Sequence, residues 1–459
     1  LAPPLEGVRA WMSAYPYTCF EQRLSKAVAT GDAGAWNALA GEMPTYQAPD
    51  GLLRYFPSES LSGSEALSAY ALALTSEAGL SMPSGPRAKL IEGLKAVLDG
   101  RVRNKTYGDI RIQKAAIFAA LARAGAATPD MLGQVGLPPQ EMPTGLLADH
   151  IAALDKVPGL ANAAALKSQA EAVLRTRLVY EGTRVDLSDG NNVPWWMMSS
   201  GDESAIKALY AVLGRPGWQD DAPKLMVGVA SRQSRGRWDT TTANAWGTIA
   251  VRKFGSIYPA TAIMGTTSLS LGGRSIAKSW PLATDARLAS FALPAAAIPL
   301  KLSQAGGAGP WAAVQVSAAV PLTQPLMAGY RLSRKVDVVQ ARVPGKLTRG
   351  DVIRVTLTIE ASAERNWVVV ADPVPGGATV LGTLGGQSEQ LQEGGAAEGT
   401  QPSYVERAKD AWRGYFAWLP RGTHVVSYTM RLNAAGRFSL PPSRVEAMYS
   451  PAIRAQLPN

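Results

Sequence analysis

The sequence predicts a multidomain α + β protein in which an α/α toroid comes first and β-sandwich domains follow. Three observations support this fold class. The chain has 459 residues, enough for two to four domains. Residues 1–256 are rich in Ala and Leu and are broken by Gly and Pro, as expected for helical hairpins. After residue 256 the apolar residues alternate with polar ones, which is the period of a half-buried strand.

The helical part contains five similar segments. Each opens near a Ser, Thr or Asp, whose side chain can cap a helix N-terminus, and continues with small apolar residues that allow close packing. Their starts are spaced by roughly 35 to 60 residues, enough for a pair of helices in each repeat. We therefore predict an α/α toroid over residues 1–256, with an open helical solenoid as the alternative. The five segments begin at Ser62, Asp109, Thr144, Asp202 and Thr240.

Strands are predicted beyond the helical part. Apolar and polar residues alternate at residues 353–359, and the same alternation recurs at residues 426–432. Turns rich in Gly and Pro separate such runs, which favours β-sandwich architecture. We predict one small β domain at residues 257–326 and a β-sandwich domain at residues 327–459.

Four local features receive predictions of their own. Residues 382–401 are rich in Gly, Gln and Glu, so we predict a mobile loop there. Residues 404–418 are predicted to form a short helix that lies on the sheet. His424 opens a strand and is predicted at the surface. His150 falls inside a predicted amphipathic helix and is expected to be structural.

Cys19, which is the only cysteine, lies three residues before Gln22. Positions i and i+3 lie on one face of a helical turn, so the two side chains can meet there. Attack of the thiol on the Gln22 amide would expel ammonia and leave an internal thioester, which is a reactive acyl donor. A helix that begins near Cys19 would stabilise the thiolate through its N-terminal N–H groups. Glu21 is a candidate to assist proton transfer.

A thioester must be kept dry, and aromatic residues near it can provide the cover. Tyr15, Tyr17 and Phe20 flank Cys19 in the sequence. The alternative is that Cys19 is a small core residue without chemistry, since free cysteines are often buried. The motif, taken together with features further along the chain, favours the thioester.

Residues 16–22 read Pro-Tyr-Thr-Cys-Phe-Glu-Gln. This segment resembles the thioester signature Pro-Tyr-Gly-Cys-x-Glu-Gln of the alpha-2-macroglobulin and complement family, and it departs from the signature at Thr18, where Gly is usual. Residues 236–246 are similar to the late toroid helix of bacterial members, and residues 440–451 are similar to their C-terminal strand and tail. The resemblance spans nearly the whole chain and points to the C-terminal portion of a bacterial alpha-2-macroglobulin.

The resemblance also implies how the β domains are built. Residues 257–326 would be the returning part of a CUB-like β domain, whose first half lies upstream of Leu1. Residues 327–459 would form a macroglobulin-like, receptor-binding-like β-sandwich domain.

A shield for the thioester is implied as well. In bacterial relatives a Met of the last domain and a Tyr just before the thioester keep water from the bond. The matching positions here are Met448 and Tyr15, with Tyr17 beside them in the shield. The alternative for Met448 is ordinary core packing.

By the same resemblance the protein would be a single-use covalent protease inhibitor and not a turnover enzyme. Cleavage of a bait region in upstream domains of the same protein would pull the last domain away and expose the bond. Residues 101–108 contain no His that would carry the acyl group to hydroxyls, so Lys amines of the attacking endopeptidase are the expected acceptors. The implied location is the periplasm or cell envelope, with envelope proteins as further partners and a membrane anchor in the missing N-terminal region.

Composition and charge argue against several other classes. The net charge of +10 comes from scattered basic residues without a basic block, so no nucleic-acid partner is predicted. One Cys and two distant His do not make a zinc site, and neither a phosphate loop nor a serine-hydrolase motif is present, so no metal or cofactor is expected. No run of 18 apolar residues exists that would span a membrane. The chain begins at Leu1 without a signal-peptide pattern, as expected for the C-terminal piece of a larger exported protein.

Three alternative functions stay open at this point. A cysteine hydrolase or acyltransferase would need a base such as His150 beside Cys19. A toroid glycosidase would need carboxylates that line the ring, and Trp195-Trp196 comes nearest to a sugar-binding motif. An envelope scaffold that keeps the fold would never form the thioester, and Thr18 in place of Gly keeps this alternative open. The candidate carboxylates of a glycosidase are Asp109, Asp149, Asp202 and Glu203.

Overall fold

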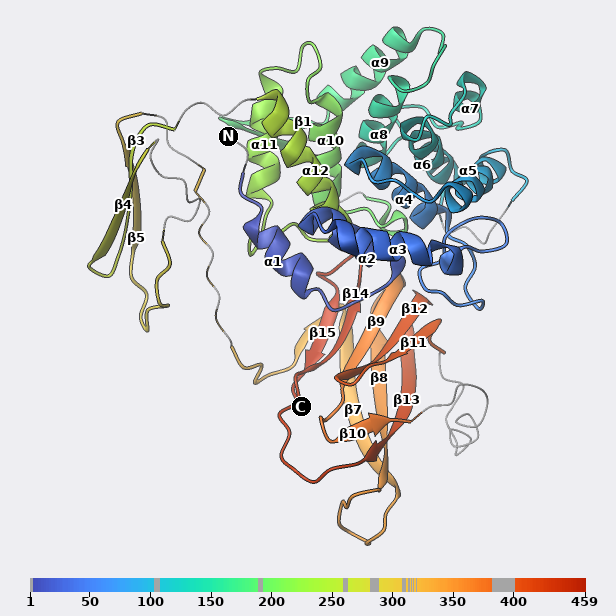
Figure 1. Ribbon diagram of the computed structural model, residues 1–459, viewed down its shortest axis with the longest axis vertical. Coiled ribbons are helices and arrows are strands. Elements are labelled where there is room, and N and C mark those ends of the chain that lie inside the picture. Colours follow the sequence, from blue (N-terminus) through green and yellow to red (C-terminus); the bar gives the residue numbers. More distant parts are fainter. Residues whose placement is uncertain are drawn as a thin grey trace. The chain divides into compact units, whose positions relative to one another are not determined.

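The computed structural model describes two compact units (Figure 1). The first unit comprises Leu1–Tyr55 and Gly63–Ala319, and the second comprises Phe56–Ser62 and Val320–Asn459. Helices and antiparallel sheets are both present, as the predicted α + β class requires. The described residues are 3–102, 108–188, 193–258, 263–280, 289–307, 311–312, 314, 316, 318, 320–381 and 401–459.

The first unit is mainly helical. A short 3-10 helix at Trp195–Met197 lies between two of the α-helices in the sequence. None of the helices in the described part of the chain is both long and apolar enough to cross a membrane. The α-helices are α1 Glu6–Ala14, α2 Phe20–Thr30, α3 Ala33–Tyr46, α4 Glu65–Ala78, α5 Ser84–Leu98, α6 Ile110–Arg123, α7 Pro129–Gly133, α8 Thr144–Leu154, α9 Ala163–Arg175, α10 Gly201–Val212, α11 Asp221–Ser231 and α12 Thr241–Ile257.

Six of these helices form a closed circuit of contacts. Helix α2 packs against α4, and the contacts continue from α4 to α6, α8, α10 and α12, until α12 packs against α2 (Figure 1). Helix α8, in this circuit, is buried at every position, whereas its neighbour α9 buries only Ala170 and Leu174. Small residues permit the close packing, because a Cβ atom added at Gly145 would lie 3.0 Å from the Ser204 Oγ of α10.

The five repeated segments of the sequence are helices α4, α6, α8, α10 and α12 of this circuit. Two of them are capped by the residue that opens the predicted segment, because Asp109 and Thr240 accept hydrogen bonds from backbone N–H groups of the first turn. Helix α4 is capped by Ser64 instead of Ser62. Helix α10 is capped by Ser200 instead of Asp202, which lies in the first turn. Helix α8 follows Pro143, and Thr144 is its first residue.

The described residues of the first unit also form five strands. Strands β1 (Leu178–Glu181) and β2 (Arg184–Leu187) pair as an antiparallel hairpin. Strands β3 (Gly265–Leu271), β4 (Arg274–Trp280) and β5 (Leu300–Ala305) form an antiparallel sheet in the order β4-β3-β5.

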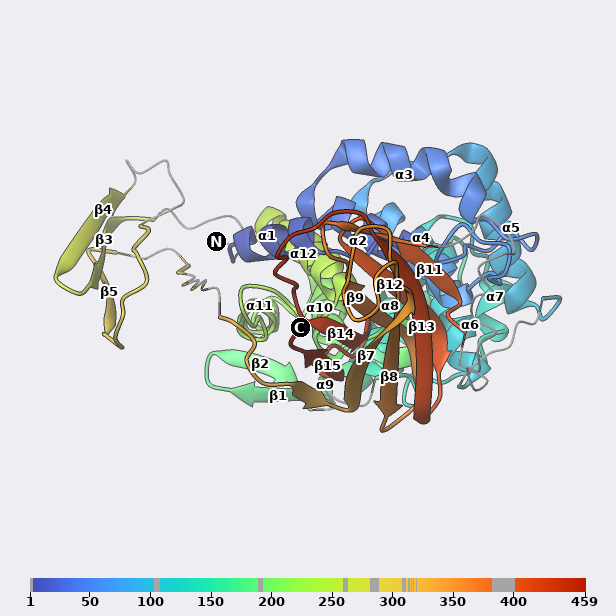
Figure 2. The same cartoon turned by 90° about the horizontal axis from the view of Figure 1, so that it is seen from below.

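The second unit is a β-sandwich. One sheet has the strand order β10-β13-β8-β7, and the other has the order β11-β12-β9-β14-β15-β6. Figures 1 and 2 show the two sheets face to face, and residues from both form one apolar core. The strands are β6 Leu326–Ala328, β7 Tyr330–Gln340, β8 Val352–Ala361, β9 Arg365–Pro373, β10 Ala378–Val380, β11 Tyr404–Arg407, β12 Ala411–Leu419, β13 Gly422–Leu432, β14 Ser443–Ala447 and β15 Arg454–Leu457.

The alternation predicted for this sandwich is present. In β8 the side chains of Val355, Leu357 and Ile359 are buried, and the polar residues between them are less buried. Strand β13 buries Val426, Tyr428 and Met430 in the same way and pairs with β8 in antiparallel register. These two strands therefore confirm the predicted period of two.

Phe56 also belongs to this second unit, although it lies between α3 and α4 in the sequence. Its ring stacks on Tyr404 with 4.1 Å between centroids and lies 4.6 Å from the ring of Tyr415. Two strands of the six-stranded sheet thus supply the aromatic partners of a residue encoded within the helical part of the chain.

Two local predictions for the sandwich are wrong. Residues 404–418 form strands β11 and β12 and not a helix, because aromatic residues on a paired strand are well placed to pack against the core. His424 is buried and not on the surface. It is a residue of β13, and its ring Nε2 makes a 2.8 Å hydrogen bond with the Pro420 carbonyl oxygen, which satisfies that nitrogen in the interior. The loop predicted at residues 382–401 lies outside the described residues except for Gln401.

Candidate functional site

Cys19 is the N-cap residue of α2, so a helix begins directly after the cysteine. Its backbone is extended, with φ −64° and ψ 165°. Gln22 turns its side chain back, and its Oε1 accepts a hydrogen bond from the Cys19 backbone N–H at 3.2 Å. The Cys19 side chain in turn faces the backbone N–H of Gln22. This reciprocal capping brings the thiol and the amide carbonyl to the same first turn.

Thr18 takes the place of the signature Gly without strain. Its side chain is exposed, and its φ is not in the left-handed region that favours glycine. Just after the pair, the Phe20 N–H donates to the Tyr55 carbonyl oxygen at 2.8 Å. The first turn is therefore held by main-chain contacts that the Thr18 side chain does not disturb.

The motif is dry. Cys19 and Glu21 are 0% exposed and Gln22 is 1% exposed. Tyr17 is buried and Tyr15 is half-buried, and their rings meet edge to face with 5.4 Å between centroids. An environment of this kind protects a thioester from hydrolysis.

The amide nitrogen of Gln22 is in an unusual position. Its Nε2 is buried and has no hydrogen-bond partner among the described residues, although the carbonyl oxygen of the same amide is bonded to Cys19. A buried donor without an acceptor costs about 1–3 kcal/mol. The amide is thus held at its oxygen and destabilised at its nitrogen, which is the group that would leave as ammonia.

Glu21 is held by hydroxyl groups from two helices. Ser25, one turn further along α2, donates to Glu21 Oε1 at 2.6 Å. Thr241, the first residue of α12, donates to the same oxygen at 2.8 Å. The Ser25 Oγ also lies 2.6 Å from the Tyr70 hydroxyl of α4. All four side chains are buried, so this is a polar network inside the helical unit.

A pair of carboxylates lies beside the N-terminus of α12. Burial, followed by the nearby Asp202 carboxylate, raises the pKa of Asp239 to about 7. Ser200 donates a hydrogen bond to Asp239 Oδ1 at 2.7 Å, and the Asp239 N–H donates to Asp202 Oδ2 at 3.1 Å. The folded protein therefore favours the protonated form of Asp239.

This pair gives a testable pH dependence. Because the folded pKa of Asp239 lies above its ordinary value, its contribution to stability is largest at low pH and decreases as pH rises towards 7. Asp239→Asn removes the ionisation and is expected to raise the melting temperature more at pH 8 than at pH 5. Differential scanning calorimetry at the two pH values measures this, with exposed Asp220→Asn as the control. An equal shift at both pH values would contradict the assignment.

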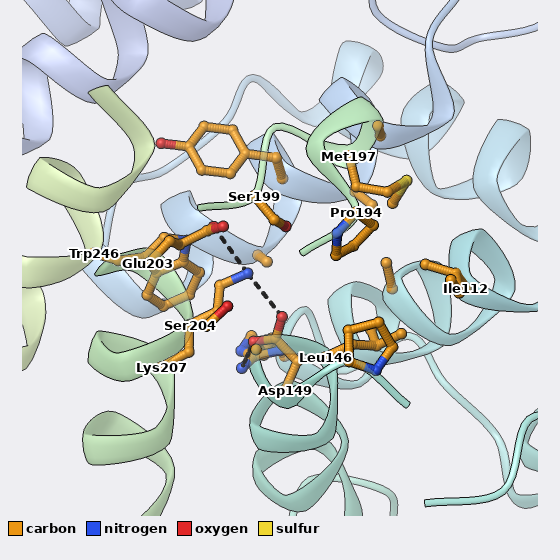
Figure 3. Close-up of a pocket in the computed structure, with 18 residues that line it drawn as sticks. Ile112, Leu146, Asp149, Pro194, Met197, Ser199, Glu203, Ser204, Lys207 and Trp246 are labelled. Carbon is orange, nitrogen blue, oxygen red and sulfur yellow. Dashed lines mark hydrogen bonds and ion pairs between the residues drawn. The ribbon is translucent and has the colours of Figure 1, made fainter. Parts of the chain in front are cut away.

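A small cavity, called the central cavity below, is lined by residues of α4, α6, α8, α10 and α12 (Figure 3). Its volume is about 50 Å³, which leaves room for a few water molecules. Lys207 lies between two carboxylates, with its Nζ 2.9 Å from Asp149 Oδ2 and 3.0 Å from Glu203 Oε1 (Figure 3). Burial opposes the ammonium form, but Asp149 and Glu203 outweigh it and raise the pKa of Lys207. Tyr70 and Trp246 are among the other lining residues.

The four carboxylates considered for a glycosidase all form ion pairs with basic side chains of the same unit. Asp109 caps α6 and pairs with Arg111 at 2.8 Å. Asp202 lies 3.4 Å from Arg232, and Asp149 and Glu203 share Lys207. Asp149, Asp202 and Glu203 balance cations inside the helical unit, and Asp109 caps a helix at its surface, so the geometry favours a structural role for all four.

His150 is a structural residue of α8. Burial lowers its pKa to about 4, so the ring is neutral near pH 7. The ring lies 6.4 Å from that of Phe118, and Nδ1 has no hydrogen-bond partner among the described residues. Within the described part of the chain, no group of three or more His, Cys, Asp and Glu residues could hold a metal ion.

Met448 lies in the second unit, directly after β14. Its side chain is buried, and its backbone N–H donates to the Trp367 carbonyl oxygen at 3.0 Å. The shield that pairs Met448 with Tyr15 stays a prediction.

Sequence reasoning missed three residues of the network around Glu21. Ser25 follows Glu21 by four positions, and this spacing on one helix face could have indicated it. Tyr70 and Thr241 are far from Glu21 in the sequence, and only the circuit of helices brings them close.

Comparisons with known proteins show which fold and which domain the chain resembles. A family model described as the Bacterial Alpha-2-macroglobulin MG10 domain matches residues 329–452. No curated protein sequence matches the chain. Native Escherichia coli alpha-2-macroglobulin, spanning domain MG7 to the C-terminus, is similar with a TM-score of 0.73 and 16% identity, and the match covers 100% of this chain and 75% of that chain.

Two further solved structures cover 99% of this chain. They are the native conformation of E. coli alpha-2-macroglobulin, with a TM-score of 0.72 and 17% identity, and Salmonella alpha-2-macroglobulin reacted with methylamine, with a TM-score of 0.72 and 18% identity. The match spans only 30% of each of those longer chains. At such low sequence identity, the structural similarity shows a shared fold and not a shared function. Residues 329–452 thus match the bacterial alpha-2-macroglobulin MG10 domain, and the chain has the fold of the C-terminal region of bacterial alpha-2-macroglobulins.

Proposed function

We propose that this chain is the C-terminal part of an exported bacterial inhibitor of endopeptidases, which captures its target once and covalently. The circuit of helices is the α/α toroid that carries an internal thioester between Cys19 and Gln22. Residues 257–326 are the returning part of a CUB-like domain, and residues 327–459 are the macroglobulin-like domain. The proposed location is the periplasm or cell envelope.

One observation carries this proposal. The Gln22 amide accepts a hydrogen bond at its carbonyl oxygen from Cys19 N, while its buried nitrogen has no partner among the described residues. A bond to the oxygen polarises the carbonyl and supports the negative charge that develops there on attack. Loss of ammonia removes the buried nitrogen that has no acceptor. Both effects favour closure of the bond.

The closing step balances without any other reactant. The Cys19 sulfur bonds to the Gln22 side-chain carbonyl carbon, the carbon–nitrogen bond breaks, and ammonia leaves with the thiol proton. Glu21 takes that proton from sulfur and returns it to nitrogen. The N-terminus of α2 stabilises the thiolate on the way.

Capture reverses the exchange with a different amine. A Lys amine of the target protease attacks the same carbonyl carbon, the carbon–sulfur bond breaks, and one amine proton passes through Glu21 to sulfur. The protease is left joined to the former Gln22 by an amide. Tyr15, Tyr17 and Met448 are proposed to exclude water until cleavage of a bait region upstream exposes the bond.

Intact-mass measurement tests the proposal. A closed thioester lowers the mass by one ammonia, about 17 Da, and methylamine then adds about 31 Da and releases one titratable thiol. Incubation of the full-length protein with a protease that cleaves its bait region is expected to yield a covalent adduct on denaturing gels. A folded chain of full mass with a titratable thiol before treatment would contradict the trap and leave an envelope scaffold without the bond.

A further inference from the structure

We propose that Ser25, Thr241 and Tyr70 are positioning residues for the thioester chemistry, because they form the hydrogen-bond network that fixes the carboxylate of Glu21, a residue between Cys19 and Gln22 in the motif. The inference rests on the proposed function, since it concerns the same bond. It adds three residues that no motif identifies, and they come from three helices of the first unit.

The count of hydrogens sets the direction of each hydrogen bond. Ser25 has one hydroxyl hydrogen, and it points to Glu21 Oε1 at 2.6 Å. The Tyr70 hydroxyl, 2.6 Å from the Ser25 Oγ, must then donate to Ser25. Thr241 donates to Glu21 Oε1 at 2.8 Å. The hydroxyl hydrogens of Ser25 and Thr241 thus both point to Glu21 Oε1, and that of Tyr70 points to Ser25.

Burial, followed by the charge of Glu21, raises the pKa of Tyr70 well above its ordinary value. The phenol therefore keeps its proton and acts as a constant donor to Ser25. Tyr70 also lines the central cavity, so the network extends from the motif to a space that has room for a few water molecules.

The arrangement also specifies how Glu21 takes part. Oε1 already accepts two hydrogen bonds, so the proton exchanged with the motif goes to Oε2. A carboxylate held from two sides in a dry site keeps one orientation, and its proton transfer needs no reorganisation at the moment of reaction. Loss of either donor lets the carboxylate rotate away from the reacting pair.

Thr241 provides the sharpest test. Thr241→Val removes the hydroxyl and keeps the shape, whereas Thr241→Ser keeps the hydroxyl. We expect Thr241→Val to slow methylamine incorporation about tenfold, and Thr241→Ser to stay close to the wild-type rate. Thr248→Val is the matched control, because Thr248 is buried in the same helix and its hydroxyl donates to the Asn244 carbonyl oxygen of that helix.

Two more matched pairs extend the test. Ser25→Ala is compared with Ser204→Ala, whose hydroxyl donates to a backbone carbonyl of its own helix region, and Tyr70→Phe is compared with Tyr210→Phe, whose hydroxyl bonds Glu77. Ser25→Ala is expected to match Thr241→Val, and Tyr70→Phe is expected to show a smaller loss. Rates come from intact-mass time courses, and the melting temperature of each variant is measured beside them.

The outcomes separate this inference from the proposed function. A wild-type chain without the mass deficit overturns the proposed function and this inference with it. A wild-type deficit with rates unchanged in Thr241→Val and Ser25→Ala overturns only the inference. Equal slowing in Thr241→Ser and Thr241→Val, or in the control variants, also overturns it, because the effect would then follow packing and not the hydroxyl.

Discussion

Cys19→Ala and Gln22→Met are each expected to abolish the thioester completely while the fold is kept. Cys19→Ala deletes the nucleophile and removes one sulfur from a buried site. Gln22→Met deletes the carbonyl carbon that would be attacked, and Met fills a similar volume in an apolar setting. Neither variant should show the mass deficit, take up methylamine or form an adduct with a protease.

The two variants differ in one measurable respect. Gln22→Met retains a free thiol, which becomes titratable on denaturation, and Cys19→Ala retains none. Val28→Ala, a truncation of another buried residue of α2, controls for packing and is expected to keep the mass deficit. Adduct formation by Cys19→Ala would exclude Cys19 as the site of capture, whatever the mass of the wild-type chain.

Asp149→Ala is expected to give the largest loss of stability. Arg123 Nη2 lies 2.7 Å and Lys207 Nζ 2.9 Å from the Asp149 carboxylate, and all three are in the interior of the helical unit. Removal of the carboxylate leaves both cations without their shared partner. Breaking a buried pair in this way typically costs about 3–5 kcal/mol.

Urea denaturation of the wild-type and Asp149→Ala chains measures this effect. Glu92→Ala serves as the control, because Glu92 pairs with Lys95 on the surface and such pairs contribute about 0.2–1 kcal/mol. Similar losses in the two variants would contradict the assigned role of Asp149.

The pH dependence of this effect has a definite sign. Burial would raise the pKa of Asp149, but Lys207 and Arg123 outweigh it and lower the pKa below the ordinary value. The stabilisation is therefore complete above the unfolded pKa of about 4 and is lost as pH falls through the folded pKa. The difference in stability between wild type and Asp149→Ala should shrink only below about pH 4.

Local patterns predicted much of this fold because they depend on neighbours in the sequence. The helices that begin after Asp109 and Thr240 follow from cap residues and small apolar runs, and the helical turn that carries Cys19 and Gln22 follows from their spacing. Strand β8 follows from alternation, since one face of the strand packs into the core of the sandwich and the other does not.

The wrong predictions have physical causes. Residues 404–418 contain aromatic and small residues that are compatible with a helix or a strand. Pairing with β9 in the sheet stabilises the strand conformation. His424 is polar but is buried because a carbonyl oxygen satisfies its ring. The partners of Glu21 were out of reach because Thr241 approaches it only when the first and last helices of the circuit meet.

The membership of Phe56–Ser62 in the second unit has a consequence for dissecting this protein. A truncation after residue 319 would keep Phe56 but discard Tyr404 and Tyr415, the rings on which it rests. In the isolated helical unit the Phe56 side chain would then be exposed, which favours self-association. Work on the isolated helical unit should therefore include the Phe56→Ser variant. The gain in solubility of this variant over the unchanged truncated chain would measure how much of the self-association comes from the exposed Phe56 ring.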